Sequence, residues 1–484
     1  MPIAIPATIT GRLGLDDMAR HVPVRVWVPE GVQALRITFD HAPRHPGAGD
    51  IAHQLSISVT APDGPRGTRH NAADQSVFLS ARQASPGYLP GPITPGEWLV
   101  EIDTHRILPP AGIDWTVTVT AADLPDPLPL PDPLPAPLPL PDIARFAPRP
   151  GPGWFRGDLH RHTLHSDAIW SPAAMVADAR ARGYDFAALT DHNTVSALPE
   201  ARQAAGADLL VLPGMELTTF HGHALALGSG ALHDWRIRDG QSMAERTRDI
   251  MAAGDLFVIA HPMSLGHPHC TGCTWAWSDM FPGPARLVEV WNGLWAGRGG
   301  FAAWPGNALA LDLFHGWLNA GHRLVATAGS DDHGRHGADA RPGHMLVQAQ
   351  ALTVPALLDG LARGHAVLTC GPVLTLSGPP EAPLLPGDCI PAAVDLHLRW
   401  QGAAEGRLRL VTGQRGAEGV RLAADTPVGP QGAAVLPAGL WSGADWAMVE
   451  LRDAAGGMQA LVNPVFVGDC ASRPTSRSGR RDAG

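Results

Sequence analysis

Short runs of β-prone apolar residues alternate with longer stretches of helical pattern over residues 151–375. Strands are predicted at five of these apolar runs, at 154–155, 186–189, 209–212, 256–260 and 324–327. Helices are predicted between and after them, at 171–183, 194–205, 242–254, 307–320 and 354–363. Strands that alternate with helices predict an α/β fold built on a parallel barrel. In such barrels the chemistry gathers at the C-terminal ends of the strands.

Capping residues indicate where three of these helices begin. Ser171 followed by Pro172 is typical of an N-cap and the first helical position. Thr194 is expected to cap the second helix. Ser242 and Glu245 have the spacing of a capping box, so we expect the third helix to begin there.

The regions on either side of the barrel show β patterns instead. Residues 1–122 predict a small β-sandwich, with strands at VPVRVWV, LRITFD, LSISV, WLVEID and WTVTVTA. Residues 376–468 predict a second, sandwich-like β domain packed on the barrel, with strands at VDLHLRW, GRLRLV, AMVELRD and QALVNPVFV. The histidines of the first region form no ligand-like phrase. We expect ordinary surface or turn residues at His21, His41, His45, His53, His70 and His105.

Two further segments are predicted to lack helices and strands. Residues 123–150 carry alternating prolines, which block helix and ladder pairing and favour a polyproline II spacer. About 20 residues at roughly 3.1 Å each would extend it to near 60 Å. A ligand for an SH3-like domain is the alternative, and a spacer explains the segment without a partner. The polar tail at 469–484 is expected to be disordered.

Histidine and acidic residues follow the predicted strands in six phrases: DLHRHTLHSD, LTDH, PGMEL, HGH, IAHP and GSDDH. Neutral imidazole and carboxylate are the ligands that hold Zn²⁺, Mn²⁺ or Fe ions. One such phrase has an ordinary structural explanation, but six in strand order predict a polynuclear metal site.

The first phrases supply ligands from an extended segment and the loop after it. His160 and His162 share one face, because the strand period is two. Asp167 can fold back over the site, with His165 beside it. His192 ends the next strand, and Asp191 is expected to orient a ligating imidazole.

The later phrases complete the expected set. Glu216 can bridge two cations, and a buried glutamate without a cation partner would be costly. His223 is favoured as a ligand over His221. The remaining candidates are His261, which ends the strand at 256–260, and Asp331 with His333, which follow the strand at 324–327.

Composition narrows the function classes. The chain contains no lysine, which excludes a lysine Schiff base, a pyridoxal phosphate enzyme and a Walker-type phosphate loop. A net charge of −10 weighs against a nucleic-acid binder. No signal peptide or membrane span is recognisable, and five cysteines fit a reducing compartment. We therefore expect a cytoplasmic protein that acts on a small molecule.

The six phrases together resemble the motif series of the polymerase-and-histidinol-phosphatase (PHP) superfamily, and the AHP…CTGC…VEVWN stretch is most similar to the CehA/McbA-like metallohydrolases. The resemblance covers residues 151–375 and implies a distorted (β/α)7-type barrel that holds two or three divalent metal ions. It implies a first ligand set of His160, His162, Glu216 and Asp331. The implied second set is Glu216, His223 and His261, and the third is Asp167, His192 and His333. Trinuclear phosphatases of the superfamily usually carry histidine where Asp167 stands.

The expected chemistry is hydrolysis by a metal-bound hydroxide, without a covalent enzyme intermediate. Asp167, His165, His192 and Asp331 are the candidate catalytic residues, the first three as proton donors to the leaving group. The favoured substrates are small phosphomonoesters or phosphodiesters. The alternatives are an aryl ester or carbamate hydrolase and a non-enzymatic, metal-stabilised binding protein.

Aromatic and polar residues after His261 bear on the substrate. Trp275, Trp291, Asn292 and Arg298 are candidate substrate contacts, although packing accounts for most tryptophans. Glu289 is a candidate for a ligand-orienting or substrate role. Phosphate recognition would draw on Arg161, Arg298 or Arg335. The His267–Cys273 stretch is expected to shape the pocket, with a separate metal or redox site as the alternative.

Overall fold

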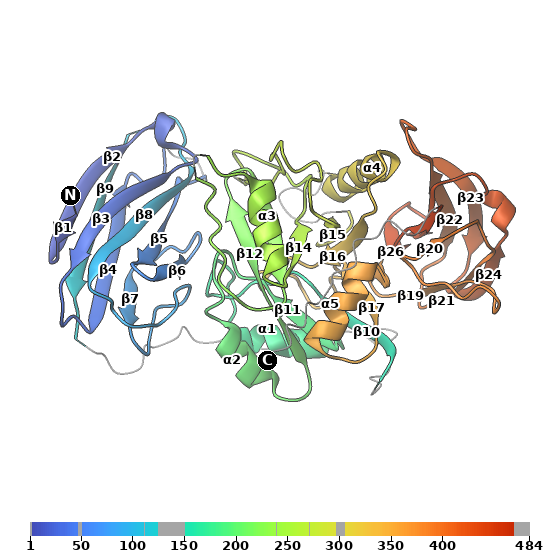
Figure 1. Ribbon diagram of the computed structural model, residues 1–484, viewed down its shortest axis with the longest axis horizontal. Helices are drawn as coiled ribbons and strands as arrows, with labels where there is room; N and C mark the ends of the chain where they lie inside the picture. Colours follow the sequence, from blue (N-terminus) through green and yellow to red (C-terminus); the bar gives the residue numbers. More distant parts are fainter. Residues whose placement is uncertain are drawn as a thin grey trace, which may run out of the picture.

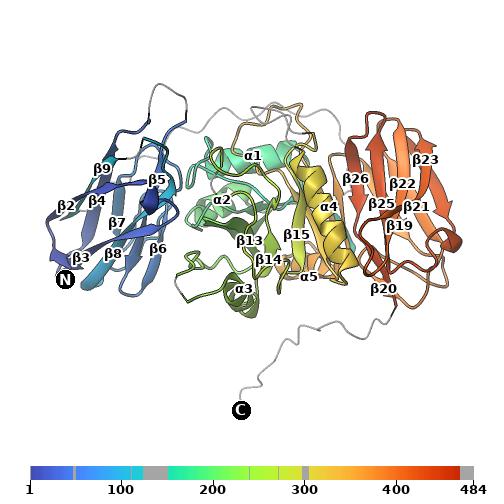
Figure 2. The same ribbon diagram turned by 90° about the horizontal axis from the view of Figure 1, so that it is seen from above.

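The structure is a computed structural model that describes residues 2–46, 51–110, 112–123, 151–238, 240–270, 272–296 and 305–468. Along its longest axis the N-terminal strands, a central α/β unit and the C-terminal strands follow one another (Figure 1). The view from above shows the same row, with α4 facing the C-terminal strands (Figure 2). The proline-rich segment and the tail, predicted as spacer and disordered, lie outside the described residues apart from Asp123.

Two sheets enclose the N-terminal core. A five-stranded sheet has the order β1-β3-β8-β5-β6 and a four-stranded sheet the order β2-β9-β4-β7. The inward positions of the alternating segments are apolar and buried, as Val26, Val100 and Val117 illustrate. The strands are β1 Ile3–Ala4, β2 Ala7–Leu13, β3 His21–Val28, β4 Ala34–Ala42, β5 Gln54–Ala61, β6 Gly64–Thr68, β7 Val77–Ser80, β8 Gly96–Arg106 and β9 Ile113–Ala121.

The central unit is a mixed sheet covered by helices. Its strands run in the order β16-β15-β14-β13-β12-β11-β10-β17-β18. They are β10 Gly153–Asp158, β11 Phe186–Leu189, β12 Leu210–Thr219, β13 Gly222–Leu227, β14 Leu256–Ile259, β15 Leu287–Asn292, β16 Val325–Gly329, β17 His344–Ala349 and β18 Ala366–Thr369. The helices are α1 Pro172–Ala181, α2 Leu198–Ala205, α3 Met243–Ala252, α4 Gly306–Asn319 and α5 Val354–Arg363.

The α/β class is confirmed, but a (β/α)7-type barrel is not. Strands β10, β11 and β12 are parallel, as are β14, β15 and β16, whereas β13 is antiparallel to both of its neighbours. Only Phe220 and His221 separate β12 from β13, too few residues for the crossover that a parallel pair requires. Glu216 was predicted to lie at the end of a strand. Because β12 continues to Thr219, it lies within the strand instead.

Helix starts agree with the capping signals at two of three places. Ser171 accepts a hydrogen bond from the Ala174 amide, and Ser242 with Glu245 forms the capping box. The prediction that Thr194 caps the second helix was wrong. α2 begins at Leu198, where Pro199 suits the first turn, and the Thr194 hydroxyl instead accepts the Ser196 amide in a preceding turn.

The curved sheet brings β16 back beside β10. The Asp331 amide donates to the His160 carbonyl at 2.8 Å, and the Ser330 amide donates to Asp158 Oδ1 at 2.9 Å. At the other end of β16 the buried side chain of Asn463 bridges β16 and β18. It accepts from the Ala326 amide at 2.7 Å and donates to the carbonyls of Ala326 and Ala366. Side chains therefore satisfy backbone groups along a seam where no ladder forms.

The C-terminal strands continue the central sheet, because β18 pairs with β26. The order continues β26-β25-β22-β23, with β20 and β27 alongside, and a three-stranded sheet β19-β21-β24 completes this region. The strands are β19 Val373–Ser377, β20 Cys389–Ile390, β21 Leu396–Gln401, β22 Gly406–Gly413, β23 Arg421–Val428, β24 Gln431–Leu436, β25 Trp446–Asp453, β26 Met458–Val462 and β27 Val465–Val467. Among the described helices, none is long and apolar enough to cross a membrane.

The N-terminal sheets are docked on the central unit by buried polar contacts. Glu101 of β8 is fully buried and pairs with Arg236 and with Arg238, whose Nη1 lies 2.8 Å from Oε1. The Arg106 guanidinium donates to the carbonyls of Pro268 and His269 at 3.0 and 3.1 Å. A buried carboxylate held by two guanidinium groups fixes the orientation of one unit on the other.

Replacing Asn463 by Leu tests the seam. The change removes three hydrogen bonds and leaves buried backbone groups of Ala326 and Ala366 unpaired, which we expect to cost on the order of 3 kcal/mol or more. Thermal unfolding followed by circular dichroism should show a midpoint several degrees lower. Gln401→Leu, at an exposed amide on β21, is the control and should change the midpoint by about a degree or less. Equal midpoints for the two variants would show that the Asn463 bonds contribute nothing.

Candidate metal centre

The ligand candidates lie on or directly after β10 to β14 and β16, strands that the curved central sheet brings around one point. Gly329, the last residue of β16, lies so close to the next strand that a Cβ there would come within 2.3 Å of His160 Cβ and 2.6 Å of Glu289 Oε1. Only glycine allows this approach. His261 and Asp331 have positive φ angles of 26° and 50°, which is uncommon for residues other than glycine. Such strained backbone is often found where side chains must be aimed at a site.

Four side chains form the central group around Glu216, which has no exposed surface. Glu216 Oε2 lies 3.2 Å from His160 Nε2 and 3.3 Å from His162 Nε2. Asp331 Oδ1 lies 2.9 Å from His162 Nε2 and 3.4 Å from His160 Nε2. Ligand atoms about 2.1 Å from a tetrahedral ion are about 3.4 Å apart, so these spacings fit one cation.

Several of these atoms have no hydrogen-bond partner although they are buried. They are His160 Nε2, both ring nitrogens of His162, Asp167 Oδ1, Glu216 Oε2, His223 Nε2 and Asp331 Oδ1. Unpaired buried polar atoms are rare in native proteins and call for an explanation. These unpaired imidazole nitrogens and carboxylate oxygens lie close together, which fits a group of cations, while Glu216 Oε1 is hydrogen-bonded by His223 and His261.

A second group surrounds the other oxygen of Glu216. Glu216 Oε1 lies 3.0 Å from His223 Nδ1 and 3.1 Å from His261 Nε2. The Nδ1 atom of His192 lies 2.9 Å from the other oxygen, Oε2. His192 therefore lies close enough to share an ion with Glu216 and His223. The two oxygens of Glu216 thus face different sets of imidazoles, as a bridging carboxylate requires.

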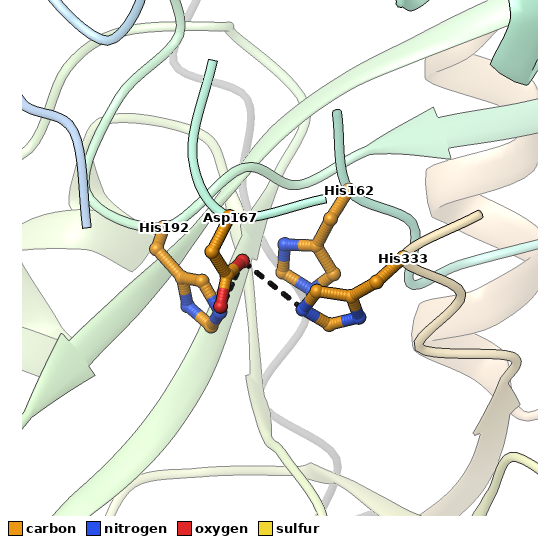
Figure 3. A group of neighbouring side chains, drawn as sticks. All are labelled: His162, Asp167, His192 and His333. Carbon is orange, nitrogen blue, oxygen red and sulfur yellow. Dashed lines mark ion pairs between the residues drawn. The ribbon is translucent and has the colours of Figure 1, made fainter. Parts of the chain in front are cut away.

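A third group gathers around Asp167 on the side nearest the N-terminal sheets. His333 Nε2 lies 3.1 Å and His192 Nε2 3.5 Å from Asp167 Oδ1. Figure 3 shows the rings of His162, His192 and His333 placed around this carboxylate. The His162 and His333 rings stack with centroids 4.2 Å apart, so His162 joins the central and third groups.

Neighbouring polar residues hold the candidate ligands in place. Glu289 accepts from His160 Nδ1 at 3.1 Å, which leaves Nε2 free to face Glu216. The other oxygen of Glu289 accepts from the His261 amide at 3.0 Å. Asp191, predicted to orient an imidazole, instead accepts from the amide and hydroxyl of Thr163 and from the Ser166 hydroxyl. It therefore shapes the loop that carries Asp167.

The charges in this cluster strongly perturb one another. Burial alone would raise the pKa of Glu216, but His192, His160 and His223 outweigh it and hold this pKa well below its usual range. Burial would lower the pKa of His261, but contact with Glu216 raises it to about 9. Burial opposes the same change at His333, where Asp167 raises the pKa to about 10. In the metal-free cluster the carboxylates of Glu216 and Asp167 are thus paired with protonated imidazoles at His261 and His333, whereas burial lowers the pKa of His162 to about 4.

Other predicted site residues lie elsewhere. His165 is directed away from the three groups, with Nδ1 2.8 Å from Ser196 Oγ and Nε2 3.7 Å from Glu200. His221 is exposed at the β12–β13 turn, edge-on to Trp277 at 5.2 Å. His223 pairs with Thr218, which lies on the same face of β12 as Glu216, so its ring reaches Glu216 diagonally, whereas His221 lies in the turn before β13 begins.

Of the predicted substrate-contact residues that the structure describes, Asn292 lies at the site and the two tryptophans do not. Trp275 and Trp291 are buried and donate to the carbonyls of Met280 and Gly293, so both are packing residues. Asn292 lies at the site, where its amide donates to Glu289 at 3.1 Å and to Asp331 at 3.3 Å. Arg298 lies outside the described residues. Arg161 is fully buried against Asp178 and Trp170, so it is not a phosphate-binding residue.

The loop after His261 contains a disulfide between Cys270 and Cys273, although the cysteine count predicted reduced thiols. Their Cα atoms are 5.6 Å apart, a normal distance for such a pair. The Cys273 carbonyl lies 3.3 Å from His261 Nδ1. The loop therefore supports a candidate ligand, and its described residues belong to none of the ligand groups.

Two residues of the N-terminal sheets were missed. His53, His70 and His105 were predicted as surface or turn histidines, but all three are buried, and the last two lie near the site. The His70 ring lies 4.7 Å from the His192 ring and 4.5 Å from the His105 ring. Sequence reasoning could not find them, because no ligand-like phrase surrounds either residue and only domain docking brings them to the site.

Among known proteins, no family model matches the chain. A 65-residue stretch, 13% of the chain, is 38% identical to the 5'-3' exoribonuclease Rnm of Salmonella typhimurium and 40% identical to a 5'-3' exoribonuclease of Haemophilus influenzae. The chain spans about a fifth of the length of these relatives, 22% and 23%.

Solved structures give partial overlaps. A two-domain protein from Bacteroides vulgatus, described as containing a PHP-like metal-dependent phosphoesterase, covers 68% of this chain and 97% of its own, with 14% identity and a TM-score of 0.37. A protein from Bifidobacterium adolescentis, described as a metal-dependent phosphoesterase, covers 42% and 94%, with 17% identity and a TM-score of 0.29. An amidohydrolase from Chromobacterium violaceum covers 37% and 87%, with 20% identity and a TM-score of 0.25.

Proposed function

We propose that the chain is a divalent-metal-dependent hydrolase of the PHP superfamily, similar to its CehA/McbA-like branch, that acts on small phosphomonoesters or phosphodiesters. The observation that carries the proposal is the set of converging, buried ligand atoms around Glu216 that have no hydrogen-bond partners. A single structural ion needs only four closed ligands, so four adjoining groups linked through His160, His162, His192 and Glu216 exceed what a stabilising role requires.

The residues present can hold two or three ions, of zinc, manganese or iron. His160, His162, Glu216 and Asp331 would hold the first, and Glu216, His223 and His261 the second. Asp167, His192 and His333, with His162, would hold a third. Such ions supply Lewis-acid stabilisation of charge on substrate oxygens and an activated water.

The chain's own side chains position the substrate and protons. Glu289 and Asn292 fix His160 and Asp331, so the reacting group meets a preorganised set of charges. His333 and His192 hold the pKa of Asp167 well below its usual range, so this carboxylate is ionised and has no proton to give. His192 remains the candidate to protonate the leaving group when the third group holds no ion. His165 is withdrawn from that role, because its Nδ1 is engaged by Ser196.

An aryl ester or carbamate hydrolase is the second candidate. A cavity of about 890 Å³ lies beside the β12–β13 turn, with Phe220, Trp235 and Trp277 among its lining residues. These aromatic faces suit an aryl group, and the burial of Arg161 removes one of the cations expected to bind phosphate.

We retain a cytoplasmic location as a prediction.

Glu216→Gln tests the bridge. The amide cannot supply two anionic oxygens, so we expect at least one ion per chain to be lost and hydrolysis to fall about a thousandfold, or about 4 kcal/mol. Metal content is measured by inductively coupled plasma mass spectrometry beside the turnover assay. Glu450→Gln, at a buried glutamate of β25 paired with Arg452, is the matched control and should retain both. Full metal content with normal turnover in Glu216→Gln would reject the bridge.

Metal loading should depend on pH in a defined direction. His261 and His333, with pKa values of about 9 and about 10 in the metal-free chain, must lose protons before they can bind a cation. Affinity should therefore rise as pH increases from 6 to 9, and loading should release protons. Calorimetric titration of Zn²⁺ or Mn²⁺ in two buffers of different ionisation enthalpy measures both effects. An affinity that stays constant with pH, without proton release, would contradict the assignment of these two ligands.

Substrate class is decided by parallel assays of the metal-loaded chain. The panel contains an aryl phosphate, a bis-aryl phosphate, an aryl acetate, an aryl carbamate and a short 5'-phosphorylated RNA. We expect the phosphate esters to be hydrolysed with the highest kcat/KM. Faster turnover of the carbamate or acetate would favour the second candidate, and turnover of RNA alone would overturn the small-molecule assignment. Metal binding without any turnover would indicate a non-enzymatic binding protein.

A further inference from the structure

We infer that the N-terminal sheets complete the active site, and that His70 contributes a substrate contact by donating a hydrogen bond from Nδ1 to an oxygen of a phosphate ester held at the third ligand group. This inference rests on the proposed hydrolase function. It assigns a role to a residue outside the motif-bearing unit, beyond the sets that hold metal ions.

The first argument is the unsatisfied nitrogen of His70. The side chain is buried, and its Nδ1 has no hydrogen-bond partner in the described part of the chain. The other nitrogen, Nε2, faces the amide nitrogen of Gln54 at 3.1 Å and accepts from it. A neutral imidazole that accepts at Nε2 carries its proton at Nδ1. His70 therefore presents a donor that no described residue receives.

The second argument is location. The His70 ring is tilted against the His192 ring, and His192 Nε2 faces Asp167 in the third group. His105 packs on the other side of His70 and also contacts Phe220 at the tip of the β12–β13 hairpin, at 5.2 Å. The non-bridging oxygens of a phosphate ester are acceptors that an adjacent N–H can meet.

The third argument is that His70 is held where it is. Asn71 next to it has a positive φ of 52°, and its amide donates to Ser56 Oγ at 3.0 Å. Gln75 donates to the Arg69 carbonyl at 3.2 Å. Arg69 Nε in turn donates to the Leu164 carbonyl at 3.1 Å, which ties this turn to the loop that carries Asp167. The position of the donor is thus preorganised by both units.

Packing alone could also explain a buried ring, so the variants must separate shape from hydrogen bonding. His70→Phe keeps a ring of similar size and removes the donor. His70→Asn retains an N–H near the position of Nδ1 and loses much of the ring. A packing role predicts that phenylalanine is tolerated better than asparagine, and a donor role predicts the reverse.

The experiment uses the full metal-loaded chain and three readouts: metal content, kcat/KM for an aryl phosphate, and the Kd of inorganic phosphate by calorimetry. We expect His70→Phe to retain its metals but to lose about 10- to 100-fold in kcat/KM and to bind phosphate more weakly. His70→Asn should recover most of both losses. His41→Phe, on the outer sheet at β4, is the matched control and should match the wild type.

Each other outcome has a defined meaning. Wild-type behaviour of His70→Phe, or a larger loss for asparagine than for phenylalanine, overturns the substrate contact. Loss of a metal ion in His70→Phe overturns it as well, because His70 would then be a ligand. If the wild type binds phosphate but hydrolyses no phosphate ester, the proposed function fails, while weaker phosphate binding by His70→Phe still supports the contact. If the wild type binds no phosphate, both fail.

Discussion

A single carboxylate, that of Glu216, sets the requirements that the rest of the central unit meets. It has no exposed surface, and an ionised carboxylate without compensating charge would be very costly there. Imidazoles from the segment after β10, from the end of β11, from β13 and from the end of β14 lie 2.9 to 3.3 Å from its two oxygens. The fold is thus organised so that positive charge, from protons or from metal ions, can reach the same point from several strands.

This requirement explains departures from regular geometry near the site. The β12–β13 hairpin places Glu216 and His223 on paired strands, which a parallel strand with a helical crossover would not do. Gly329 permits the approach of β16 to His160, and positive φ angles turn His261 and Asp331 toward the cluster. Asp158 and Asn463 then satisfy the backbone groups that lack ladder partners along the seam.

The N-terminal sheets are part of the site's architecture as well as a neighbouring unit. Buried Glu101 binds Arg236 and Arg238, and the Gly87 amide donates to Ser196 Oγ at 3.1 Å, so one face of these sheets is fixed over the third ligand group. Buried polar contacts of this kind specify an orientation more strongly than they add stability. They bring His70 and His105 to a cluster whose first ligand, His160, follows them by 90 and 55 positions in the chain.

The sequence by itself determined the ligand candidates, because strand periodicity and donor chemistry are local. His160 and His162 share a face by the period of two, and nine predicted ligands fall in the three adjoining groups. The alternation of apolar residues likewise located most strands, and the capping box located α3. Tertiary structure alone decided the antiparallel β13, the withdrawal of His165, the burial of Arg161 and the arrival of His70. Each of these depends on which surfaces, distant in sequence, pack together, and no short stretch of sequence determines the energy of such packing.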